Sequence, residues 1–193
     1  MPLQLLDKCY HFTHVDNLAS IAERGLLSHN AVRASRIERV DISDHDVQNR
    51  RANRIDPIHG RRIHDYVPFY FNPRNSMLYR LASHGLQHPL VMIEVDLNVV
   101  KEHAAIYSDG NAACRNTQFT DSMDDLTDTF DVICAPRWND VEDGGRIRCA
   151  EVLIPDHFES KLISDIYCQN EDVACYVRNE LGYQITVDRT MFF

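Results

Sequence analysis

The sequence predicts an α+β domain built on a mixed or antiparallel sheet. Three segments, residues 67–71, 90–97 and 148–155, are dense in β-branched and aromatic residues, which is typical of buried strands. They are scattered along the chain, without the regular alternation of strand and helix found in doubly wound parallel folds. The sequence also has no GxGxxG-type phosphate loop, and the DGG at 143–145 indicates only a turn.

The chain is expected to begin with a strand followed by a short helix. Residues 10–13 have strand character, and the apolar spacing that follows predicts a helix capped by Asp16 or Thr13. Gly25 stands where a helix terminator is expected.

The next segment is polar and rich in arginine, with a helix expected around 43–52. Ten arginines and six acidic residues lie between Arg33 and Arg80, a local charge of +4 in a chain of net charge −9. The overall charge argues against indiscriminate binding of nucleic acid. The arginines suit phosphates and bases, although a solvated helix face remains an alternative interpretation.

The second half predicts shorter elements. A strand and turn are expected in 104–113, and an acidic helix capped by Thr120 or Asp121 in 119–130. The end of the chain predicts a strand over 162–168, a helix over 171–182 and a strand over 183–187.

Composition indicates one globular domain over residues 1–193. Hydrophobic residues make up 44% and charged residues 25% of the chain, and no run approaches a membrane span. The N-terminus lacks a secretion-signal pattern, so we expect a cytoplasmic protein. The six cysteines form no CxxC and are expected to be reduced and mostly buried.

His11 and His14 raise three interpretations. A zinc site would need a third ligand, which nothing nearby supplies, so no metal is expected. A histidine of the core is the second interpretation. In the third, His11 and Thr13 alternate on one strand face and line a pocket together with the start of the following helix.

Glu151 is a second candidate, because it lies among apolar residues in a predicted strand. Burying an unpaired carboxylate is costly, so such a residue has a partner or a function. A solvent-facing edge position and an ion pair with Arg146 or Arg148 are the structural alternatives.

The segment 65–79 places five aromatic residues around Arg74 in an Asn-Pro-Arg turn. Such a cluster indicates either core packing or a stacking surface for bases or a nicotinamide ring.

Four stretches together resemble one family. YHFTHVDNLASIAERGLL (10–27), DYVPFYFNPRNSMLY (65–79), YSDGNAA (107–113) and RCAEVLIP (148–155) occur in the order and approximate spacing of the DarT toxins, which are DNA ADP-ribosyltransferases. The resemblance spans nearly the whole chain. It implies an ADP-ribosyltransferase fold, with a split, mixed or antiparallel β-sheet core, flanking helices and NAD in the cleft.

The resemblance also implies roles for individual residues. Arg51 and Glu151 match the catalytic arginine and glutamate, with Arg50 and Arg54 close enough to leave the choice of arginine open. An NAD-binding element is implied at about 33–54, and a substrate-binding loop at about 109–151. The residues implied to bind NAD are His11, Phe12, Thr13, Asn17, Ser20, Ser28 and Arg51, and those implied to contact DNA are Tyr70, Arg74, Asn111, Phe119, Arg137 and Trp138.

The implied reaction transfers ADP-ribose from NAD, the co-substrate, to a base of single-stranded DNA, and thymidine is favoured. A DarG-type macrodomain antitoxin is the implied partner. Asn111 stands where many members of the family have histidine, and an amide cannot titrate near neutrality. If this position helps to select or activate the acceptor base, we expect the base or sequence preference of this chain to differ from theirs. A guanosine-specific enzyme, an RNA or protein ADP-ribosyltransferase, and a non-catalytic NAD- or DNA-binding module are the alternatives.

Overall fold

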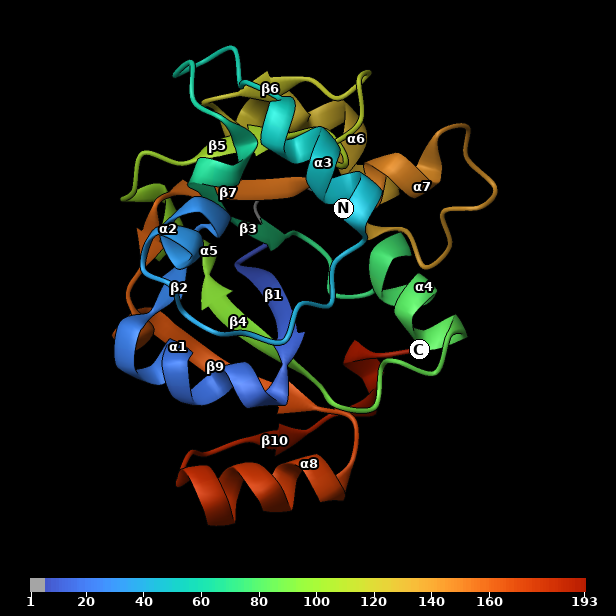
Figure 1. Ribbon diagram of the computed structural model, residues 1–193. Helices are drawn as coiled ribbons and strands as arrows, with labels where there is room; N and C mark the ends of the chain where they lie inside the picture. Colours follow the sequence, from blue (N-terminus) through green and yellow to red (C-terminus); the bar gives the residue numbers. More distant parts are fainter. Residues whose placement is uncertain (1–5) are drawn as a thin grey trace.

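A computed structural model describes residues 6–193 of the chain (Figure 1). Residues 1–5, which begin both the predicted domain and the segment judged for a secretion signal, lie outside the described residues. The described chain forms an eight-stranded sheet in the order β10-β9-β4-β1-β3-β7-β5-β6, and a small second sheet of β2 and β8. All neighbours in the large sheet are antiparallel except β10 and β9. The predicted α+β class with a mixed, mostly antiparallel sheet is confirmed.

The central strands form where the sequence is richest in apolar residues. They are β1 (Lys8–His14), β3 (Tyr66–Tyr70), β4 (Leu90–Asp96) and β7 (Glu151–Pro155). Shorter strands complete the two sheets: β2 (Leu26–Leu27), β5 (Ile106–Ser108), β6 (Phe119–Thr120), β8 (His157–Phe158), β9 (Ile163–Cys168) and β10 (Thr186–Val187). The sheet splits between its two middle strands, because β1 and β3 share a single paired position, Tyr10 with Tyr70.

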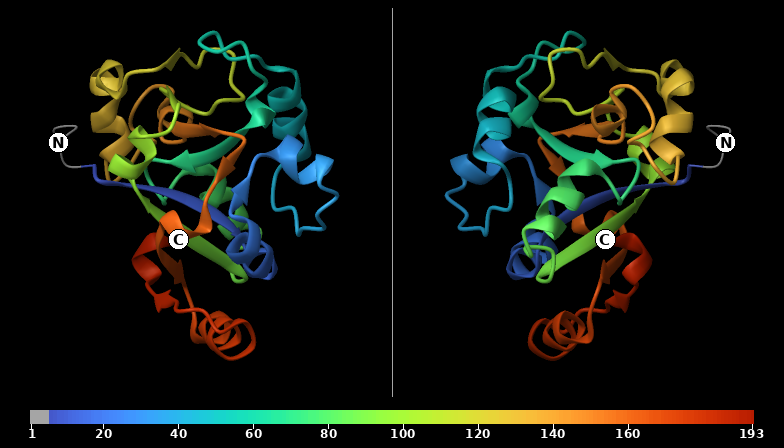
Figure 2. Two further views of the ribbon diagram at one scale, coloured as in Figure 1. Left: turned by 90° about the vertical axis from the view of Figure 1, so that its left-hand side faces the viewer. Right: turned by 90° about the vertical axis from the view of Figure 1, so that its right-hand side faces the viewer.

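Helices surround the sheet. They are α1 (Leu18–Arg24), α2 (His29–Ala34), α3 (His45–Asn53), α4 (Ser76–Ser83), α5 (Leu97–Lys101), α6 (Thr127–Cys134), α7 (Gly144–Ile147) and α8 (Glu171–Tyr176), and α8 continues into a π-helical turn, Val177–Leu181. Short 3-10 turns cover Val15–Asn17, Ile63–Asp65, Met123–Leu126, Ser160–Leu162 and Arg189–Met191. Figure 1 shows α3 and α6 at one end of the molecule and α8 at the other, and both side views agree (Figure 2).

The main hydrophobic core lies against both halves of the sheet. It joins Phe69 of β3, Ile93 of β4 and Val152 of β7 with Phe130 of α6. A second cluster packs Phe12 and Met92 under Leu78 and Leu81 of α4. The two clusters fix the strands on either side of the split, so the opening between β1 and β3 has rigid walls.

Two predicted helix starts are wrong. The side chain of His14, not that of Asp16 or Thr13, accepts a hydrogen bond at the first turn after β1, from the backbone N–H of Asp16 at 3.2 Å. The expected acidic helix begins as strand β6, because residues 119 and 120 pair with β5, and α6 starts only at Thr127.

Candidate active site

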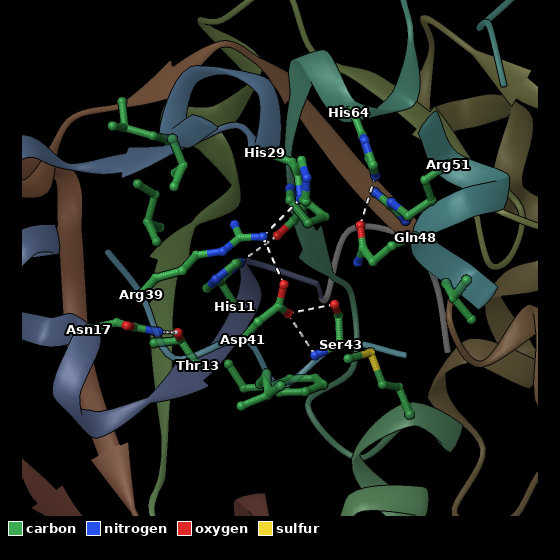
Figure 3. A pocket seen from close by; sticks show the side chains of 18 of the residues that line it. His11, Thr13, Asn17, His29, Arg39, Asp41, Ser43, Gln48, Arg51 and His64 are labelled. Atoms are coloured by element: carbon green, nitrogen blue, oxygen red, sulfur yellow. Dashed lines mark hydrogen bonds and ion pairs between the residues drawn. The ribbon is translucent and has the colours of Figure 1, made fainter. Parts of the chain in front are cut away.

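A pocket of about 350 Å³ opens at the split between β1 and β3. This volume lies within the range of small-molecule sites. The loop 35–44 and α3 form one wall, and α4 also borders the pocket, where Arg80 pairs with Asp44 of the loop at 2.9 Å. Figure 3 shows Arg51, Gln48 and His64 together at one end of the pocket, and Asn17 with Thr13 at the other.

Strand β1 presents His11 and Thr13, which lie on one face of the strand, to this pocket. The Nδ1 atom of His11 lies 2.8 Å from the carbonyl oxygen of Pro68 on β3. Burial lowers the pKa of His11, so the ring is neutral near pH 7 and donates from Nδ1. Its Nε2 atom is then an acceptor for an amide or hydroxyl group of a ligand.

Asn17 joins the start of α1 to the loop 35–44. Its Nδ2 atom donates to Thr13 Oγ1 and to the Val40 carbonyl, both at 2.9 Å, and its Oδ1 atom accepts from the Val40 N–H at 2.9 Å. These bonds hold the loop along the pocket in the region predicted to bind NAD. That function of the loop stays a prediction.

The same loop carries a polar chain that crosses the pocket. Arg39 donates to Asp41 at 3.0 Å and lies 2.9 Å from His29 Nδ1, while Asp41 accepts from the Ser43 hydroxyl at 2.5 Å (Figure 3). A ligand with phosphates and hydroxyls would therefore meet a positive guanidinium and a negative carboxylate in this part of the pocket.

Two histidines of the pocket were missed by sequence reasoning. The rings of His29 and His64 stack with centroids 4.1 Å apart, and His64 Nε2 lies 2.8 Å from Gln48 Oε1. No local pattern marks His29 or His64. Gln48 had a signal, because it lies three residues before Arg51 and therefore on the same helix face.

Arg51 and Glu151, one hundred residues apart, form a buried ion pair. Arg51 Nη1 donates to both carboxylate oxygens of Glu151 at 2.9 Å. Among the three candidate arginines only Arg51 lines the pocket, while Arg50 is exposed and Arg54 binds backbone carbonyls of the loop after β5. The geometry therefore favours Arg51, and its catalytic role stays a prediction.

Glu151 lies behind Arg51. Its side chain is 1% exposed and accepts a further hydrogen bond from the Ala112 N–H at 2.8 Å. Glu151 is also paired across the sheet with Tyr70, whose pKa burial raises well above its usual value. A ligand that contacts the carboxylate must therefore displace part of the Arg51 guanidinium.

The alternative pairing of Glu151 with Arg146 or Arg148 is wrong. Arg146 instead binds Asp109 at 2.7 Å and Asp143 at 2.5 Å. Arg148 donates to the carbonyls of Ile133 and Ala135. Both arginines brace the predicted substrate loop, so they are not available to the carboxylate.

Most of the other predicted NAD-binding residues line the pocket. Phe12 and Ser20 do so, together with Tyr70 and Asn111 from the predicted DNA set. Ser28 does not line the pocket. Its hydroxyl instead accepts a hydrogen bond from the Ala31 N–H and caps α2. Asn111 Oδ1 accepts from the Ala113 N–H at 2.9 Å, which leaves the amide nitrogen as a donor.

The remaining predicted DNA contacts lie outside the pocket. Arg74 stacks over the Phe193 ring, and Trp138 packs edge-on against Tyr79 and Phe193. Phe119 lies under Arg54, and Arg137 is exposed on the loop between α6 and α7. Their contact with DNA stays a prediction.

Within residues 6–193, no group of three or more His, Cys, Asp or Glu side chains is arranged to hold a metal ion. The six cysteines are free. No described helix combines the length and apolar character needed to cross a membrane.

Comparison with known proteins identifies the family of the chain. Residues 10–193 match the family model described as "ssDNA thymidine ADP-ribosyltransferase, DarT". A DNA ADP-ribosyl transferase of Mycobacterium tuberculosis is 31% identical over 189 residues, covering 89% of this chain and 80% of the relative. A DNA ADP-ribosyl transferase–glycohydrolase fusion protein of Thermosipho africanus is 30% identical, and this chain spans about half of it (49%).

Solved structures agree with the sequence matches. DarT of Thermus sp. 2.9 in complex with ADP-ribosylated single-stranded DNA is 26% identical, covers 97% of both chains and superposes with a TM-score of 0.88. Thermosipho africanus DarTG in complex with ADP-ribose also gives a TM-score of 0.88, over 97% of this chain and 51% of that one. The chain therefore belongs to the DarT family of single-stranded DNA thymidine ADP-ribosyltransferases and has the ADP-ribosyltransferase fold of that family.

Proposed function

We propose that this protein transfers ADP-ribose from NAD to thymidine in single-stranded DNA and releases nicotinamide. The observation that carries the proposal is the buried Arg51–Glu151 pair at the end of the pocket in the split sheet. The family model that matches residues 10–193 names the same reaction, and the Thermus relative binds ADP-ribosylated single-stranded DNA.

The chemistry follows from the groups present. The bond between ribose C1′ and the nicotinamide nitrogen breaks, and its electron pair leaves with nicotinamide. Positive charge develops on the ribose in an oxocarbenium-like transition state, as in glycoside hydrolysis. The Glu151 carboxylate stabilises that charge and binds ribose hydroxyls once the ligand displaces part of Arg51.

A ring nitrogen of the base gives up its proton to water, and its electron pair then bonds to C1′ in place of nicotinamide. Arginine is always charged in proteins, so we assign Arg51 the stabilisation of negative charge on the base. The Asn111 amide, free to donate, faces the same end of the pocket as a contact for an acceptor oxygen of the base. Neutral His11 accepts from the nicotinamide end of NAD.

The first test compares two buried glutamates. Glu151→Gln keeps the size of the side chain and the bond from Ala112, and we expect DNA modification to fall about 10²- to 10³-fold or more. Glu94→Gln is the matched control. Glu94, on β4, is also buried (7% exposed), but it forms an ion pair with Lys8 and does not line the pocket. Mass spectrometry of oligonucleotides incubated with NAD measures the transfer.

The outcome also separates the alternative functions. Wild-type protein should modify thymine-containing strands and leave strands without thymine, RNA and protein unmodified. NAD binding without nicotinamide release would indicate a non-catalytic module and contradict the proposal. Full activity of Glu151→Gln would remove this glutamate from the mechanism.

The biological role proposed is that of a toxin, because modified thymidine blocks replication of the strand that carries it. A relative joins a DNA ADP-ribosyl transferase to a glycohydrolase in one chain. We therefore propose a separate DarG-type macrodomain as antitoxin and the cytoplasm, where NAD and DNA meet, as the site of action. Co-expression with a DNA ADP-ribosyl glycohydrolase should restore growth of cells that the wild-type chain arrests.

A further inference from the structure

A second concavity lies outside the pocket, between α3 and the loop after β5. This arginine groove is lined by Asn49, Arg50, Asn53, Arg54, Ala113 and Arg115. Three lining residues are arginines, two are carboxamides and none is a carboxylate. Such a surface in a chain of net charge −9 is a local feature that the overall charge does not explain.

The charges of the arginine groove are available to a ligand. Arg50 and Arg115 are exposed, and in the described part of the chain the side chain of neither makes a hydrogen bond or an ion pair. At longer range, the charge of Arg50 contributes to lowering the pKa of Asp44. Arg54 differs, because it donates to the carbonyls of Cys114 and Thr117 and stacks over Phe119. Arg54 therefore fixes the two walls to each other, while Arg50 and Arg115 remain free.

Both walls of the groove are continuous with the reactive end of the pocket. On α3, Arg51 points to Glu151, while its neighbour Arg50 lines the groove. On the loop, Asn111 lines the pocket, Ala112 donates to Glu151 and Ala113 lines the groove. A strand whose base enters the pocket beside Asn111 therefore has its backbone next to the arginine groove.

We propose that the arginine groove binds the sugar–phosphate backbone of the single-stranded DNA next to the acceptor base. This inference rests on the proposed function. Arg50 and Arg115 bind phosphate oxygens through their guanidinium forks, and Asn49 and Asn53 add neutral polar groups. Phosphate contacts position a strand without reading its sequence, so the groove supplies affinity and register while the pocket selects the base.

The test measures binding of a fluorescent oligonucleotide by anisotropy, without NAD, at several salt concentrations. We expect Arg50→Gln and Arg115→Gln each to weaken binding about twofold to fivefold, as for exposed ion pairs. Each should also reduce the slope of log K against log salt by about 0.7, the value for one single-strand phosphate. Arg178→Gln, at the opposite end of the molecule beyond α8, is the matched control and should change neither quantity (Figure 1).

Neutral methylphosphonate linkages locate the contact. Replacing one charged phosphate near the acceptor base in this way should weaken binding of the oligonucleotide to the wild type. It should not weaken binding to Arg115→Gln, because that variant has already lost the contact between Arg115 and the phosphate. Calorimetry with NAD serves as a second arm, since NAD also carries phosphates. Arg115→Gln should leave NAD affinity unchanged, and weaker NAD binding with unchanged DNA binding would overturn the proposal.

The two proposals fail in different ways. Groove variants with wild-type DNA affinity and salt slope, in a protein that still modifies DNA, would refute the groove alone. A protein that binds DNA through the groove but transfers no ADP-ribose would refute the proposed function alone.

Discussion

His64 shows how a single side chain of the pocket responds to pH. Burial, together with the neighbouring His29 and Arg51, lowers the pKa of His64 to about 4. An unfolded histidine titrates near 6.5. The unfolded state therefore binds more protons between these values, so this contribution to stability is present above pH 6.5 and is lost as the pH falls towards 4.

We predict that His64→Asn flattens this dependence. Between pH 7 and pH 5 the wild type should lose about 2 kcal/mol more of its free energy of unfolding than the variant, from the pKa difference. Urea denaturation across that range measures the difference. His45→Asn is the control, because His45 lies on α3 with its side chain 88% exposed. Equal slopes for wild type and His64→Asn would contradict the assignment.

For single residues, the sequence identified which side chains are important but not which contacts they make. An apolar setting singled out Glu151, and the family resemblance singled out Arg51. Their partnership joins β7 to α3 across one hundred residues, and no local spacing encodes such a contact. The stack of His29 on His64 has the same origin in tertiary structure.

The connection of α1 to β2 depends on one glycine. Gly25 ends α1 with φ 76° and ψ −177°, a backbone region open essentially to glycine alone. A Cβ atom there would lie 2.3 Å from the Phe158 carbonyl of β8 and 2.5 Å from His157 Nε2. The small sheet of β2 and β8 therefore needs glycine for both conformation and space.

Gly25→Ala should accordingly destabilise the fold by about 2–4 kcal/mol, from backbone strain plus steric overlap. Gly85→Ala is the comparison without crowding, because Gly85 also has a positive φ of 71° but a Cβ atom added there would meet nothing within 4 Å. It should cost about 1 kcal/mol. Thermal unfolding of both variants provides the comparison, and equal losses would show that contact with β8 is unimportant.

Elements were predicted well where the pattern is local. The apolar strands β3, β4 and β7, the helix α3 and the terminator Gly25 all lie where the sequence placed them. The acidic segment 119–130 was wrong at its start, because pairing of β6 with β5 overrides helix propensity. The two-residue strands β2 and β8 are too short for any periodic signal.

For the whole molecule, the distribution of charge matters more than its sum. The chain carries −9 overall, yet the arginine groove gathers three arginines at the end of the molecule that carries α3 (Figure 1). The exposed acidic residues Asp124, in the turn before α6, and Asp128, in the first turn of α6, lie at the same end (Figure 1). They oppose the approach of DNA to that end.

Asp124→Asn/Asp128→Asn should therefore bind single-stranded DNA with an association rate constant a few-fold higher at about 0.05 M salt, through reduced repulsion. The dissociation rate constant should change little, because neither residue lines the groove or the pocket. Near 1 M salt the Debye length is about 3 Å and the gain should vanish.

The control makes the same change in net charge elsewhere. Asp172→Asn/Glu180→Gln removes two exposed carboxylates at and beyond α8, at the far end of the molecule (Figure 1). If local potential governs encounter, this variant associates with DNA at the wild-type rate, since screening confines each charge to about 10 Å at 0.1 M salt. Equal acceleration of both variants in stopped-flow measurements would mean that net charge, and not its placement near α3 and α6, limits the approach of DNA.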